Sequence, residues 1–320
     1  MDYMKVKNAV SFWFLKFISC IISYLPLVFG RFLGRLAFCI DKKHRDIALK
    51  NLNTAFSRGK DKTEIYSIAK KVFENLGMNL IEFCRIPQLN SENIDKYVTI
   101  RGFDNFLNAR KKNKGVLFLT AHFGNWELMA AAHALKGYPL NVVVREPDNP
   151  IFERFVKYVR TRCGNKMMDK NSQMRSILNV LKKGESVGVL LDQNVTWVEG
   201  VFADFFGKLA ATNKGLALLA IGSQSPVIPA FIIRKDYKTH ELIFGKEIPV
   251  QITDDKRADI LVNTARFTKV IEDMIRKYPD QWFWVHQRWK SRPENDPNKG
   301  KKSEAMIYSS ICPLSRIKRL

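Results

Sequence analysis

The sequence of 320 residues is long enough for one large domain or two small ones, and 46% of its residues are hydrophobic. Lys and Arg number 53 against 31 Asp and Glu, which gives a formal net charge of +22. This charge indicates acidic partners, namely nucleic acid, anionic lipid headgroups or acidic proteins, and says little about the fold. The five cysteines are scattered without a CxxC spacing, which argues against a zinc site or a disulfide framework.

The first forty residues contain a long apolar segment. Residues 10–30 are close to the length that a bilayer crossing needs, although Pro26 disfavours a straight helix. Basic residues are more numerous after this segment than before it, which places the following chain on the cytoplasmic side of a membrane. We therefore predict that residues 1–40 are a membrane anchor. The alternative is a long buried core helix.

Helices are predicted for residues 46–55 and 62–84, where apolar side chains recur at helical spacing. From residue 115, short apolar runs typical of buried strands alternate with helical patterns. The strands are expected at 115–121, 140–144, 187–191, 226–233 and 241–245, and the helices at 126–135, 152–162, 172–182, 213–221 and 255–277, with Thr212 as a cap. This order predicts a single α/β domain over residues 41–294, with a mainly parallel or mixed sheet flanked by helices. Residues 295–320 are expected to form a basic polar tail.

The segment from Thr120 to Glu127 carries the candidate chemistry. His122 follows a predicted buried strand, a glycine permits a sharp turn, and Asn125 is a suitable cap for the next helix. Ligands of open α/β sheets bind where strands end. We expect the turn to fold the Glu127 carboxylate onto the His122 imidazole, so that the imidazole can take a proton from a hydroxyl. The alternative is a core histidine satisfied by a nearby acid.

Further motifs follow in a fixed order. HFGNWE has a His-x4-Glu spacing, and after it come REPDNP (145–150), an arginine pair at 160 and 162, LKKGE (181–185), LLDQ (190–193), FFG with AAT (205–212), PVIPAF (226–231) and YPDQWFWVHQRWK (278–290). With these motifs, the chain from about residue 10 to residue 294 resembles the bacterial lipid A biosynthesis acyltransferases, which are lauroyl or myristoyl acyltransferases of the lysophospholipid acyltransferase superfamily. One departure is Gln287, where the family usually has a basic residue.

The resemblance implies direct transfer of an acyl group from a thioester to a hydroxyl, with His122 as the general base and Glu127 assisting it. Asp192, expected at a strand end, and Arg162, whose guanidinium suits a phosphate or the donor, match family positions associated with the active site. Their alternatives are a structural ion pair or surface charges. The predicted substrate-binding residues are Arg162, Asp192, Arg145 and Asn125, whereas Arg160 is interpreted as a solvated helix charge. No cofactor and no metal ion are expected.

Three functions remain open. The first is acylation of a lipid A precursor from acyl carrier protein at an anionic bacterial inner membrane, with the catalytic domain on the cytoplasmic side; an acidic carrier suits a basic surface. The second is acylation of a phosphatidylinositol mannoside or glycerophospholipid from acyl-CoA. The third is a membrane-anchored nucleic-acid-binding protein, prompted by the net charge. Because no nucleic-acid-binding module is recognisable, no nucleic acid partner is expected.

Overall fold

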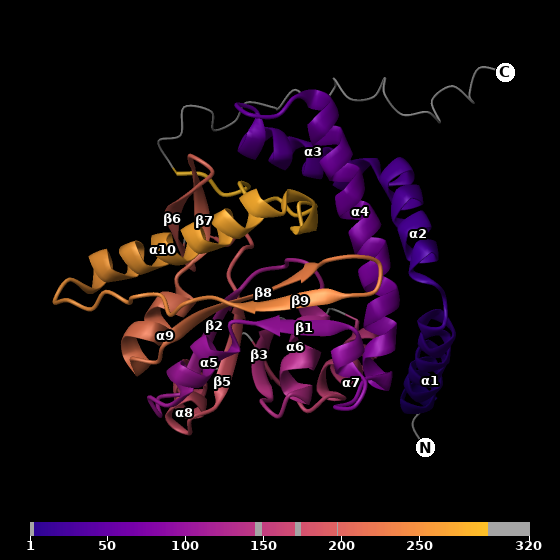
Figure 1. Cartoon of the computed structure of the whole chain (residues 1–320), viewed down its shortest axis with the longest axis horizontal. Coiled ribbons are helices and arrows are strands. Elements are labelled where there is room, and N and C mark those ends of the chain that lie inside the picture. The colour runs from indigo at the N-terminus through magenta and orange to yellow at the C-terminus, as the bar shows by residue number, and fades with distance from the viewer. Residues whose placement is uncertain (1–2, 145–148, 170–173, 197, 294–320) are drawn as a thin grey trace.

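One mixed sheet forms the centre of the protein in the computed structural model, which describes residues 3–144, 149–169, 174–196 and 198–293. The strands of this sheet are β1 (Val98–Arg101), β2 (Val116–Thr120), β3 (Leu140–Val144), β4 (Lys166–Asp169), β5 (Ser186–Leu190), β8 (Val227–Arg234) and β9 (His240–Phe244). Among the described residues their order is β1-β9-β8-β2-β5-β3-β4, and all of these strands except β4 are labelled in Figure 1. Strands β8, β2, β5, β3 and β4 run in one direction, whereas β9 is antiparallel to β8 and parallel to β1.

Helices cover both faces of this sheet because β2 is apolar on both sides. Leu117 and Leu119 join the core cluster that contains residues of α8, α9 and α10, whereas Val116 and Phe118 join residues of α5 and α6. The helices after the N-terminal pair are α3 (Lys42–Phe56), α4 (Lys62–Arg85), α5 (Phe103–Arg110), α6 (Trp126–Leu135), α7 (Pro150–Thr161), α8 (Met174–Lys182), α9 (Gly215–Ser223) and α10 (Lys256–Lys277), with 3-10 turns η1 (Ile86–Gln88), η2 (Ile94–Lys96) and η3 (Pro279–Gln281). The predicted α/β fold is confirmed.

A separate antiparallel hairpin was not foreseen from the sequence. It joins β6 (Gly200–Phe205) to β7 (Lys208–Asn213). Thr212 therefore lies in a strand, and the prediction that it caps a helix over 213–221 is wrong. Helix α9 begins at Gly215, whose backbone N–H donates to the Asn213 side chain over 2.6 Å. The predicted tail at 295–320 lies outside the described residues.

The N-terminal forty residues form two helices instead of the single one that the apolar run suggests. Helix α1 (Tyr3–Ser23) and helix α2 (Leu27–Ile40) meet at Pro26, which has no N–H to continue a helix. Within the described residues no single helix meets the length and hydropathy needed to cross a bilayer; residues 10–23 and α2 meet them only as a pair, bent by 110°. The straight crossing helix over 10–30 is thus corrected, and the membrane anchor stays a prediction.

Helix α2 packs unusually close to α4 (Figure 1). Gly30 and Gly34 of α2 face Gly77 and the Phe73 backbone of α4, and a Cβ on any of these glycines would collide with backbone atoms of the opposite helix. Two ion pairs reinforce this contact, because the buried Glu74 carboxylate accepts from the Nε of Arg31 over 2.7 Å and from the Nε of Arg35 over 2.6 Å. The pair of N-terminal helices is therefore fixed to the rest of the fold through α4.

This close approach predicts that Gly34→Leu lowers the melting temperature of the full-length protein, because the new side chain must displace α4. Overpacking of this kind typically costs about 1–3 kcal/mol. Tryptophan fluorescence during heating in detergent measures the change. Gly59→Leu is the matched control, since a Cβ at Gly59 meets no atom within 4 Å. Equal melting temperatures for the two variants would contradict the close packing.

Candidate active site

His122 and Asp192 follow two neighbouring parallel strands at the same edge of the sheet. Strands β2 and β5 pair in parallel through Thr120 and Leu190, and the Leu191 backbone N–H donates to the Thr120 carbonyl over 3.0 Å. Both strands therefore end together, and the residues that follow them meet. The prediction that Asp192 lies at a strand end is confirmed.

The Asp192 carboxylate holds His122 at two points. Its Oδ2 accepts from the backbone N–H of His122 over 3.0 Å, and its Oδ1 lies 2.9 Å from the imidazole Nδ1. Because an ionised carboxylate only accepts, Nδ1 carries the proton, and the neutral ring presents an unprotonated Nε2. Nε2 has no hydrogen-bond partner among the residues that the structure describes, and 20% of the His122 side chain is exposed.

Asp192 is kept ionised although its side chain is fully buried. Burial alone would raise its pKa, but the adjacent His122 and the Trp282 Nε1–H, which donates to Oδ2 over 2.8 Å, hold that pKa well below its usual range. His286 also lowers this pKa electrostatically, and its Nε2 lies 3.2 Å from the backbone carbonyl oxygen of Asp192. The same pairing acts on the imidazole: burial would lower the pKa of His122, yet the Asp192 carboxylate raises it.

The Glu127 carboxylate forms no hydrogen bond with the imidazole, which corrects the expected His122–Glu127 hydrogen bond. Its carboxylate instead forms a bidentate pair with Arg160 near the end of α7, with Nε–Oε2 at 2.9 Å and Nη2–Oε1 at 2.5 Å. The Trp126 ring packs edge-on against His122, with ring centroids 5.1 Å apart. Arg160 is therefore not the solvated charge that we expected, and its side chain is only 23% exposed.

The remaining predicted site residues are not brought together. Asn125 is buried: its Oδ1 caps α6 at the Leu128 N–H, and its Nδ2 donates to Glu82 over 2.7 Å. Its role as a helix cap is confirmed, and both ends of its side chain serve the fold. Arg162 is exposed at the C-cap of α7. Arg145 lies outside the described residues.

An apolar pocket lies beside the Glu127–Arg160 pair. Thr120 and Trp126, which flank the His122 turn, contribute to its lining, and the central strands add Gly188 and other small or apolar side chains.

Three polar side chains of the site were not assigned to it from the sequence. They are Arg160, which pairs with Glu127, and Trp282 and His286, which hydrogen-bond to Asp192. Their residue types fitted a helix surface or a core as well as a site, and only the fold brings them to the end of β2. Within the described residues no three His, Cys, Asp or Glu side chains cluster as metal ligands would.

Comparison with known proteins extends over nearly the whole chain. The family model described as "Bacterial lipid A biosynthesis acyltransferase" matches residues 4–291. The chain is 30% identical to the lipid A biosynthesis palmitoleoyltransferase of Escherichia coli (strain K12), over 85% of this chain and 87% of that protein. It is 28% identical to the lauroyltransferase of the same strain (86% and 89%) and 26% identical to its myristoyltransferase (82% and 79%). The similarity thus includes both the N-terminal helices and the sheet.

The geometry of the pair predicts a pH titration. The His122 imidazole should titrate above its ordinary value of about 6.5, because the Asp192 charge favours the protonated ring. In Asp192→Asn that charge is lost while burial remains, so the midpoint should fall. NMR of protein with isotopically labelled histidine measures it, and the His122 signal is assigned by its loss in His122→Gln. An unchanged midpoint in Asp192→Asn would show that the carboxylate does not govern this imidazole.

Proposed function

Because the chain belongs to the bacterial lipid A biosynthesis acyltransferases, we propose that it moves a fatty acyl chain from a thioester to a hydroxyl of a lipid A precursor. It is therefore an acyltransferase. The observation that carries the proposed chemistry is the His122 imidazole, oriented by buried Asp192 and open at Nε2. That nitrogen is the proton acceptor that an attacking hydroxyl requires.

In the proposed reaction His122 Nε2 takes the proton of the acceptor hydroxyl as its oxygen attacks the thioester carbonyl carbon. The tetrahedral intermediate then collapses, the C–S bond breaks, and the imidazolium returns the proton to the leaving thiolate. The Asp192 carboxylate stabilises the imidazolium formed between these steps, as the raised pKa of His122 indicates. No serine or cysteine nucleophile takes part.

In this mechanism Glu127 does not exchange a proton with His122 or with the substrate. Its charge also raises the pKa of His122, although less than Asp192 does, and it fixes the Arg160 guanidinium through Nε and Nη2. Arg160 Nη1 takes no part in that pair, so it can bind a phosphate or carbonyl oxygen of a substrate. The pocket beside this pair has a volume of only about 50 Å³, but its mainly apolar lining suits part of the hydrocarbon chain of the donor.

We further propose acyl carrier protein as the donor and the cytoplasmic face of the bacterial inner membrane as the location. The net charge of +22 favours an acidic carrier and an anionic membrane. Large apolar side chains of α1 and α2 are exposed, namely Trp13, Phe14, Phe17, Ile21, Val28 and Phe32. Surface of this kind suits a lipid contact. A glycerophospholipid or phosphatidylinositol mannoside acceptor with acyl-CoA is the alternative that an assay with several donors and acceptors tests.

The assignment of the base predicts that His122→Ala lowers turnover by roughly 10²–10⁴-fold, the usual contribution of a positioned general base. Mass spectrometry of the acylated product measures the rate in detergent-solubilised protein. His44→Ala is the control, because His44 lies exposed on α3 and pairs with Asp41. Near-normal turnover in His122→Ala would rule out the proposed proton transfer.

We expect different effects on the reaction from substitution of Arg160, near the end of α7, and of Arg162, at its C-cap. Arg160→Ala should slow the reaction at saturating substrate because the Glu127 carboxylate loses the partner that orients it. Arg162→Ala should have a much smaller effect because Arg162 is exposed. Kinetics at several acceptor concentrations separate turnover from KM. A larger loss in Arg162→Ala than in Arg160→Ala would reverse the roles assigned to these residues.

The apolar pocket predicts a change in chain length. Gly188→Val adds a side chain where a Cβ meets no atom within 4 Å, so the strand should tolerate it while the pocket becomes shorter or narrower. In a mixture of C10 to C16 thioesters, the variant should transfer shorter chains than the wild type. Val189→Ile, which enlarges the next residue on the opposite face of β5, is the control. An unchanged product distribution would place the acyl chain elsewhere.

A further inference from the structure

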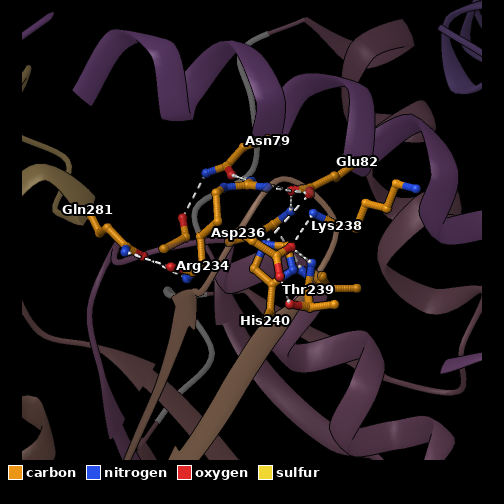
Figure 2. A network of polar contacts seen from close by, with 11 residues as sticks. Asn79, Glu82, Arg234, Asp236, Lys238, Thr239, His240 and Gln281 are labelled. Carbon is orange, nitrogen blue, oxygen red and sulfur yellow. Dashed lines mark hydrogen bonds and ion pairs between the residues drawn. The ribbon is translucent and has the colours of Figure 1, made fainter. Parts of the chain in front are cut away.

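We propose that Glu82 and Arg234 are positioning residues, which hold the catalytic turn, residues 122–125, in its working geometry without touching His122. The proposal rests on the acyl transfer proposed above and adds to it a group of buried residues from α4 and β8. Figure 2 shows this group, in which Glu82 and Asn79 of α4 meet Arg234 at the end of β8.

The ion pair at its centre is buried and bidentate. Arg234 Nη1 donates to Glu82 Oε1 over 2.7 Å, and Nη2 donates to Oε2 over 2.6 Å. Only 7% of the Arg234 side chain and 8% of the Glu82 side chain are exposed. Both groups therefore keep a fixed orientation, which a solvated pair of long side chains would not.

Two hydrogen bonds carry this orientation to the catalytic turn. Asn125 Nδ2 donates to Glu82 Oε2 over 2.7 Å, while the other end of that amide caps α6. Arg234 Nη2 also donates to Asn79 Oδ1 over 2.8 Å, and Asn79 Nδ2 donates to the Gly124 carbonyl over 2.7 Å. The ion pair thus fixes the turn through one side chain and one backbone carbonyl.

Gln281 provides a third connection. Its side chain forms two hydrogen bonds with the Arg234 backbone, accepting at Oε1 over 2.8 Å and donating from Nε2 over 3.1 Å. Its own carbonyl accepts from the Gly124 N–H over 2.8 Å. Both backbone polar groups of Gly124 are therefore bound by residues that also hydrogen-bond to Arg234, namely Asn79 and Gln281, which Figure 2 labels.

The turn cannot adjust to the loss of these contacts without moving His122. Gly124 has a φ of 57°, and a Cβ there would collide with the Ile232 carbonyl of β8, so the backbone passes β8 as closely as glycine permits. His122 is two residues away, and its hydrogen bond to Asp192 depends on where the turn places it. A displacement of about 1 Å can cost on the order of 10²-fold in rate.

The experiment compares two buried glutamates of the same helix. Glu82→Gln removes the charge that binds Arg234 and Asn125, whereas Glu74→Gln removes a charge that binds Arg31 and Arg35 of α2, which are more exposed than Arg234. In full-length protein in detergent, Glu82→Gln should lower kcat by roughly 10- to 100-fold with KM for the acceptor unchanged. Glu74→Gln should lower the melting temperature and leave kcat unchanged.

Two further variants separate positioning from folding. Asn79→Leu leaves the Glu82–Arg234 ion pair in place but removes the acceptor for Arg234 Nη2 and frees the Gly124 carbonyl, so it should lower kcat in a protein that is still folded at the assay temperature, as its melting curve checks. Glu82→Met with Arg234→Met replaces the pair by apolar side chains, an exchange that buried ion pairs often tolerate in stability. It should fold and still have the low kcat of Glu82→Gln.

Amide hydrogen exchange tests the proposal independently of catalysis. Peptides that cover residues 122–128 should exchange faster in Glu82→Gln and Asn79→Leu than in the wild type, whereas Glu74→Gln should affect peptides of α2. If His122→Ala were fully active, the proposed base would be wrong, but faster exchange at the turn would still support the positioning role. Wild-type exchange and wild-type kcat in Asn79→Leu, or in the folded double methionine variant, would overturn it.

Discussion

The arrangement of this site depends on the burial of the Asp192 carboxylate, whose side chain has no exposed surface. Asp192 is ionised at the end of β5, and an isolated buried charge would cost several kcal/mol. Its two oxygens are therefore bound by the His122 backbone, the His122 ring and the Trp282 indole. The same bonds that make Asp192 tolerable in the core fix the tautomer of His122 and direct Nε2 outward.

The segment after α10 completes the surroundings of Asp192 and His122. The Phe283 N–H donates to the His122 carbonyl over 3.0 Å, so the chain around Trp282 lies against the turn like an added strand. Arg288 is fully buried in the same segment, where burial lowers its pKa to about 10 although Asp192 acts against this shift. Its guanidinium donates to the Ala211 carbonyl over 2.7 Å and to the Thr212 hydroxyl over 2.6 Å, which ties the β6–β7 hairpin to the site.

The sequence predicts the helices and strands better than the partners within the site. Buried strands such as β2 and β5 are continuous apolar runs, and parallel strand ends are known ligand sites, so His122 and Asp192 could each be located. Their contact could not, because 70 residues separate them and Glu127 is a carboxylate close in sequence. The four-residue strands β1 and β4 and the β6–β7 hairpin were missed because short half-polar segments lack a clear period.

Helix α4 shows how one element can relate the N-terminal helices to the site. Glu74, Gly77 and Ile81 recur at helical spacing and contact α2. Asn75, Asn79 and Glu82 form a second stripe, displaced by about one residue, whose members donate to the Asp280 carbonyl, donate to Gly124 and accept from Arg234. Helix α2, which with α1 carries the exposed apolar surface, and the turn at residues 122–125, which carries His122, are therefore both positioned by contacts with the same helix, α4.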